Sequence, residues 1–122
     1  MNQPPTGKHE FDLKKRTLAF AKEVIKLCKQ LPQRVITREI VGQLIRSNGS
    51  VGANYREAND ALSKKDFSHR MKITRKEAKE TCYWLELLQE ANPEFNGSIK
   101  ILLTEATELK KIFSAIVSKS TS

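Results

Sequence analysis

Residues 64 to 79 carry seven lysine and arginine side chains and only two acidic ones, Asp66 and Glu77. Basic side chains at this density neutralise the phosphates of a nucleic-acid backbone without reading the bases. The candidate phosphate-binding residues are Lys65, Arg70, Lys72, Arg75, Lys76 and Lys79, supported by Lys14, Lys15 and Lys22 nearer the N-terminus. Tyr83 and Trp84 lie outside this basic stretch, so the sequence predicts phosphate contacts rather than base stacking.

The whole chain has a formal net charge of +8 at pH 7. This excess favours an anionic partner such as nucleic acid, and less strongly an acidic membrane surface or an acidic protein. A lysine-rich surface can also serve solubility alone. No apolar run approaches the roughly 20 residues of a membrane span, and the start, MNQPPTGKHE, lacks the apolar region of a secretion signal. We therefore expect a cytoplasmic protein with no membrane partner.

A second set of polar side chains follows the helical period between residues 43 and 57. Its members are Gln43, Arg46, Ser47, Ser50, Asn54 and Glu57. One interpretation is a solvated face. The other is a hydrogen-bonded network partly buried between helices or between subunits, because the set flanks Gly49, Gly52 and Ala53, where another backbone could approach closely. Arg46 and Glu57 are too far apart to pair within one helix, so each would need a partner elsewhere.

Signatures of catalysis and of metal binding are weak. The histidines, His9 and His69, form no Glu-x-x-His pair of the kind that holds a di-iron site in a bundle. No P-loop and no Gly-x-Gly-x-x-Gly motif is present. Cys28 and Cys82 lack metal-ligand spacing and are expected to be buried, reduced thiols. The sequence thus predicts no catalytic residue, metal, cofactor or small-molecule substrate.

The apolar period predicts four amphipathic helices, over residues 12–31, 37–61, 64–92 and 96–118. The third has the seam of a helix packed against near-parallel neighbours. This seam consists of Phe67, Met71, Thr74, Ala78, Thr81, Leu85 and Leu88. The apolar stripes of the first two helices include Leu18, Ile25, Ile45 and Leu62. Asp12, Thr37 and Ser63 have the chemistry of helix N-caps.

The second helix contains Ser-Asn-Gly-Ser-Val-Gly at residues 47–52, which local propensity would make a turn. The apolar period nevertheless keeps its phase from Leu44 through Val51 to Leu62, so we predict a continuous helix. Each interior glycine costs roughly 1 kcal/mol of helix stability. Close approach of a neighbouring helix could offset that cost.

The connections between these segments are short, so successive helices are expected to be antiparallel neighbours. The predicted fold class is all-α, an antiparallel up-down-up-down four-helix bundle in one domain. Residues 1–10 are predicted to be a flexible N-terminal arm, residues 11–118 the bundle and residues 119–122 a frayed tail.

Two segments resemble one known family. QLIRSNGSVGANYREA at 43–58 is similar to its second-helix motif, with Arg46, Ser50, Asn54 and Glu57 at the characteristic polar positions. Asp66-Phe67 stands where the family has Glu-Phe, and RKEAKETCYWLELL at 75–88 matches its third-helix pattern, with Lys76 as an insertion. The chain departs from the family motif at Tyr55-Arg56, where the family has Ile-Ala, and at Ala58, where it has Gly. The family is named for proteins encoded in intervening sequences of 23S rRNA genes, also called the S23-type ribosomal protein family.

The resemblance covers about residues 11 to 117. It implies a left-handed bundle, assembly as a ring-shaped homopentamer and an association with rRNA or ribosomes. A similar fold serves as the accessory protein of diversity-generating retroelements. The family brings no catalytic residues.

Three hypotheses for the function follow. The first is a nonenzymatic homo-oligomer that binds rRNA or another structured RNA through its basic face. The second is a protein-interaction scaffold, with Gln43 to Glu57 and the Tyr83 region as the contact and the positive charge incidental. The third, an enzyme using Glu57 or Glu80, has neither a pocket nor a substrate to support it in the sequence.

Overall fold

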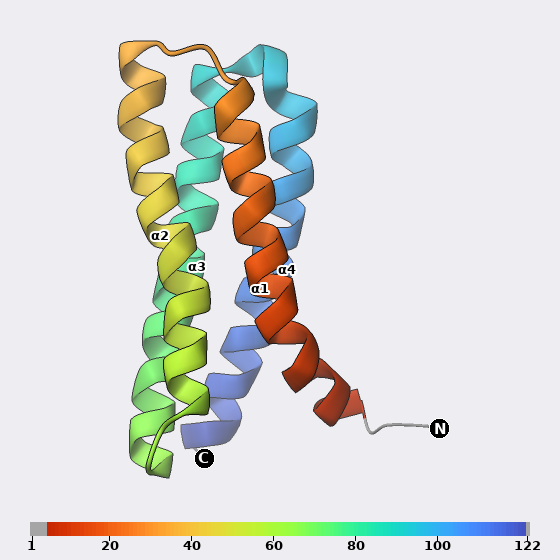
Figure 1. Ribbon diagram of the computed structural model, residues 1–122, viewed down its shortest axis with the longest axis vertical. Helices are drawn as coiled ribbons and strands as arrows, with labels where there is room; N and C mark the ends of the chain where they lie inside the picture. The colour runs from red at the N-terminus through yellow and green to blue at the C-terminus, as the bar shows by residue number, and fades with distance from the viewer. Residues whose placement is uncertain (1–4, 122) are drawn as a thin grey trace.

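The structure is a computed structural model that describes residues 5–121, with side chains from Leu13 onward. It contains four long helices (Figure 1). These are α1 Pro5–Gln30, α2 Val35–Asn59, α3 Lys64–Ala91 and α4 Asn96–Thr121, with a short 3-10 helix, η1 Pro93–Phe95, ahead of α4. No strand occurs within these residues, so the predicted all-α class is confirmed.

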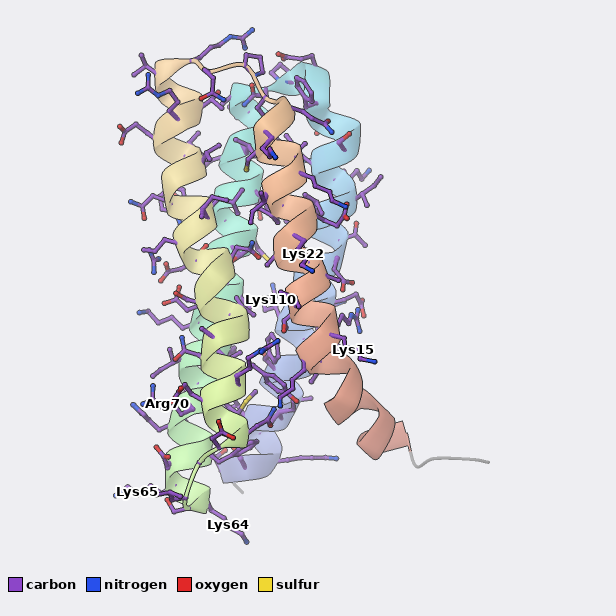
Figure 2. The ribbon with its side chains drawn as sticks, viewed as in Figure 1. Lys15, Lys22, Lys64, Lys65, Arg70 and Lys110 are labelled. Carbon is purple, nitrogen blue, oxygen red and sulfur yellow. The ribbon has the colours of Figure 1, made fainter. Side chains whose placement is uncertain are left out.

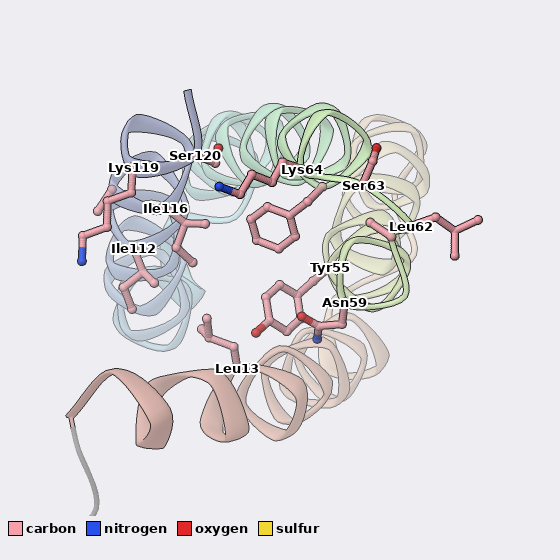
Figure 3. Close-up of a pocket in the computed structure, with 13 residues that line it drawn as sticks. Leu13, Tyr55, Asn59, Leu62, Ser63, Lys64, Ile112, Ile116, Lys119 and Ser120 are labelled. Atoms are coloured by element: carbon pink, nitrogen blue, oxygen red, sulfur yellow. The ribbon is translucent and has the colours of Figure 1, made fainter. Parts of the chain in front are cut away.

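The four helices form a square bundle. Helix α1 packs against α2 and α4, and α3 packs against the same two helices from the opposite side. Within the described residues the backbones of α1 and α3 do not come close to each other, so these two helices are diagonal, as the end-on view in Figure 3 shows. Short connections at 31–34 and 60–63 reverse the chain direction. The predicted antiparallel four-helix bundle is therefore confirmed, and the outer faces of α1 and α3 lie on opposite sides of the molecule.

The core is built from one apolar stripe on each helix. All predicted seam residues of α3 are buried, except for Phe67, which is partly buried. Four residues assigned to apolar stripes are instead exposed: Leu18, Ile25, Ile45 and Leu62. The first three lie at the edges of their stripes, beyond the width that the neighbouring helices cover, and Leu62 lies in the connection after α2.

The observed helix ends correct several predicted ones. Helix α1 begins at Pro5, so residues 5–10 are helical where an arm was predicted, and Asp12 is not an N-cap. Proline is well tolerated at the first helical position, because the amide hydrogen it lacks would have no partner within the helix. Helix α4 continues to Thr121 through most of the predicted tail. Residues 1–4 and 122 lie outside the described residues.

Thr37 is not an N-cap either, because α2 begins two residues earlier. The buried Thr37 hydroxyl instead accepts a hydrogen bond from Asn92 Nδ2 at 3.1 Å, which ties the start of α2 to the end of α3. The predicted cap of α3 is confirmed, since Ser63 Oγ accepts a hydrogen bond from the Asp66 amide at 3.0 Å.

Helix α2 runs unbroken through residues 47–52, as predicted. At Gly52, an added Cβ would lie 3.4 Å from the Thr17 hydroxyl oxygen of α1, so this glycine accompanies a close helix contact. At Gly49 an added Cβ would meet no atom within 4 Å, so this glycine borders open surface.

Candidate nucleic-acid interface

The outer face of α3 carries a line of exposed lysines. Lys65, Lys72 and Lys79 repeat every seven residues, and Lys76 stands beside them. At about 1.5 Å of rise per residue, the line from Lys65 to Lys79 extends about 21 Å. Lys76 forms a long ion pair with Glu80, with 3.9 Å between Nζ and Oε2. Within the described residues, the other three lysines form no ion pair.

The two arginines predicted for this site flank the line on opposite sides. Arg70 is seven residues before Glu77, whose carboxylate contacts α2, so Arg70 lies on the α2 side of α3. Arg75 is seven residues before Cys82, whose thiol lies near Thr107 of α4, so Arg75 lies on the α4 side. Both side chains are partly buried. They widen the basic surface toward the grooves that α3 forms with its two neighbours.

Helix α4 adds Lys110, a basic residue that is absent from the predicted set. Burial raises the pKa of the Cys82 thiol, while the Thr107 hydrogen bond and the Lys110 charge act to lower that pKa. Lys110 is therefore close to Cys82 and lies on the α4 side of α3, as Arg75 does. In the sequence, Lys110 directly follows Leu109 of the apolar stripe of this helix, which places it at the edge of that stripe.

The three basic residues predicted on α1 do not join this surface. Lys15 and Lys22 are exposed on the outer face of α1 (Figure 2), and Lys14 is exposed beside them. Because α1 is diagonal to α3, these lysines lie on the opposite side of the bundle. The nine predicted residues thus form two separate basic surfaces, six on α3 and three on α1.

The polar set of α2 is divided between a contact with α3 and exposed surface. The Arg46 guanidinium forms ion pairs with two carboxylates of α3. It donates hydrogen bonds to Glu77 Oε1 at 3.3 Å and to Glu80 Oε1 at 2.5 Å. The Ser47 and Thr81 hydroxyls lie 3.0 Å apart in the core. These contacts join α2 to α3 at residues 77–81 of α3, next to Lys76 and Lys79 in the sequence.

The rest of the set makes no such link. Asn54 donates a hydrogen bond to the Ser50 carbonyl oxygen of its own helix at 2.9 Å. Gln43 and Glu57 are exposed. A network between helices therefore includes Arg46 and Ser47 but not the whole predicted stripe.

Replacing Arg46 with alanine is expected to lower the free energy of unfolding by about 1–3 kcal/mol. Glu77 is 6% exposed, so its carboxylate would lose a charged partner in a nearly water-free position. Arg56→Ala on the same helix is the control, because Arg56 is exposed and forms no ion pair within the described residues. The Arg56→Ala substitution should change the free energy of unfolding by no more than about 0.5 kcal/mol. Urea unfolding measures both, and equal losses would contradict the assigned role of Arg46.

Both cysteines are free and buried, as predicted. Burial raises the pKa of Cys28 to about 11, so this thiol stays protonated and poorly nucleophilic near neutral pH. Among the residues with described side chains, no three His, Cys, Asp or Glu residues group in a way that could hold a metal ion. None of the described helices has the length and apolar character needed to cross a membrane.

Together, the fold and the charge distribution define a basic, all-α, antiparallel four-helix bundle. A family model described as 23S rRNA-intervening sequence protein matches residues 9–115, and the chain belongs to this family. Comparison with curated proteins found no match.

A solved structure is similar over most of both chains. It is described as a protein with unknown function from the S23 ribosomal protein family of Bacteroides thetaiotaomicron VPI-5482. The two sequences are 34% identical, the match covers 86% of this chain and 97% of the other, and the TM-score is 0.76. Neither comparison indicates an enzymatic family.

Proposed function

We propose that this protein is a nonenzymatic, cytoplasmic, homo-oligomeric bundle that binds structured RNA, with rRNA as its target. The lysine line Lys65, Lys72 and Lys79 carries the proposal, because its exposed ammonium groups are free to contact phosphates. Arg70, Arg75 and Lys76 add charge around the line. The family name supports rRNA as the partner.

A different surface is better suited to contact between protomers. Leu18 and Ile25 on α1 are 45% and 47% exposed, and Ile45 on α2 is 37% exposed. Asn48 of α2 donates a hydrogen bond to the Ala21 carbonyl oxygen of α1, and this antiparallel register brings Ile45 level with Ile25. An exposed apolar strip on a basic protein favours protein contact. We assign self-association to this α1–α2 surface, with a homopentamer as the form that the family resemblance implies.

Salt dependence tests RNA binding. A structured rRNA fragment and a random RNA of equal length are titrated with protein of known oligomeric mass. Lys65, Lys72, Lys76 and Lys79 would make four phosphate contacts per protomer. Log affinity should then fall linearly with log salt, with a slope of about −3 to −4 per bound protomer. Tighter binding to the rRNA fragment would establish recognition beyond charge. A flat salt response would contradict the proposal.

A protein-interaction scaffold is the second candidate, and the exposed Leu18, Ile25 and Ile45 favour it. In that case the apolar strip binds another protein and the lysines only keep the molecule soluble. The two candidates differ in one outcome. Charge reversal on α3 would weaken RNA binding under the first, and would leave binding of the protein partner intact under the second.

A further inference from the structure

One end of the bundle holds a pocket of about 810 Å³ (Figure 3). It lies where the connection between α2 and α3 meets Leu13 of α1 and the last turns of α4. Sites for small molecules typically have volumes of roughly 300–1,000 Å³. The space is therefore large enough for a ligand rather than for a few water molecules.

Leu13 is the first residue of α1 whose side chain the structure describes, and it belongs to the buried stripe of that helix. Three residues earlier along α1 the sequence has Glu10, and four earlier it has His9, so no apolar residue continues the stripe. Figure 3 shows α1 turning away from the other helices at this end. The aromatic ring of Tyr55 is 2% exposed, packs against Phe113 with the ring centroids 6.1 Å apart, and forms part of the inner wall of the pocket (Figure 3).

The lining combines an apolar interior with a polar rim. The interior comes from four helices: Leu13 of α1, Tyr55 of α2, Phe67 of α3, and Ile112 and Ile116 of α4. Lys64, the first residue of α3, stands at the rim. No aspartate or glutamate is among the described residues that line the pocket. Lys64 forms no ion pair within the described residues.

We propose that this pocket binds an amphiphilic monoanion, a medium-chain carboxylate. Its alkyl chain packs against Tyr55, Phe67 and Ile116, and its carboxylate pairs with the Lys64 ammonium. An apolar interior, two lysines in the lining and no acidic side chain among the described lining residues fit a ligand with one anionic end. This inference does not depend on RNA binding, which uses the outer face of α3.

Part of this lining is specific to the end of the chain. Ile116, Lys119 and Ser120 line the pocket, but they follow residue 115, where the match to the family model ends. The pocket therefore uses residues outside the segment that defines the family.

Calorimetric titration of the full chain with decanoate tests the proposal. We expect saturable binding of one decanoate per chain. Ala115→Trp should fill the pocket and weaken binding at least about 10-fold, because Ala115 lines it. Ala19→Trp is the matched control, since Ala19 is exposed on α1 and does not line the pocket. Circular dichroism confirms that each variant is folded. No saturable binding, or equal binding by the two tryptophan variants, would overturn the proposal.

Neighbouring lysines test the position of the carboxylate. Lys64→Gln should weaken decanoate binding about 5- to 10-fold and leave binding of the uncharged decanol unchanged. Lys65→Gln should change neither affinity, because Lys65 is exposed outside the pocket. If both substitutions weakened decanoate binding equally, Lys64 would not hold the carboxylate. The same would follow if Lys64→Gln weakened decanol binding as much as decanoate binding.

Discussion

Replacing Leu85 with alanine is expected to lower the free energy of unfolding by about 2–5 kcal/mol. Leu85 is fully buried in the α3 seam, the stripe along which this helix packs against both of its neighbours. The substitution removes three buried carbon atoms and leaves a cavity that a tightly packed bundle closes only in part. Thermal and urea unfolding should both report the loss.

Leu62→Ala is the matched control for this stability prediction. Leu62 is 98% exposed in the connection between α2 and α3, so the same chemical change should cost less than about 0.5 kcal/mol. The sequence pattern had assigned both leucines to apolar stripes. A loss at Leu62 as large as that at Leu85 would contradict the observed packing.

Reversing the charge of the lysine line should lower RNA affinity about 10- to 100-fold. The variant replaces Lys65, Lys72 and Lys79 with glutamate. Each exposed charge contact is worth about 0.2–1 kcal/mol, so three lost contacts give about 0.6–3 kcal/mol, and repulsion between the new carboxylates and the phosphates moves the loss toward the upper part of that range. All three side chains are exposed and, within the described residues, free of ion pairs, so the fold should be preserved. Filter binding at constant salt measures the affinity.

Helix α1 offers a control with the same spacing and the same change in net charge. Lys15, Lys22 and Lys29 also repeat every seven residues and are exposed on the outer face of α1. Replacing them with glutamate should weaken RNA binding far less, through the change in the overall field alone. Equal losses in the two variants would show that net charge, rather than the α3 face, controls binding.

Much of the fold could be predicted because helical periodicity records which side chains are buried. The seam of α3 and the continuity of α2 through its glycines both followed from an apolar period that keeps its phase. Helix ends were less predictable, since Thr37 has a cap's chemistry but uses its hydroxyl to contact Asn92, a residue distant in the sequence. Exposure of Leu18 and Ile25 depends on how much of α1 the neighbouring helices cover, which periodicity does not encode.

The candidate site could be predicted only in part, because helical periodicity describes each helix separately and not how the helices are arranged. Lysines of α1 and α3 were grouped by charge, but the diagonal arrangement of these helices separates them. Arg46 was expected to need a partner outside its own helix, yet Glu77 and Glu80 could be identified only from the packing of α2 on α3. The pocket had no sequence signal, because residues from four helices line it.

Acetylation of lysines by a water-soluble reagent, with and without bound rRNA fragment, tests the central claim most directly. Mass spectrometry reports the modification of each lysine separately. RNA should protect Lys65, Lys72, Lys76 and Lys79 on α3, while Lys15, Lys22 and Lys29 on α1 react at the rate of the free protein. Protection of the α1 lysines, or no protection at all, would contradict an RNA interface on the outer face of α3.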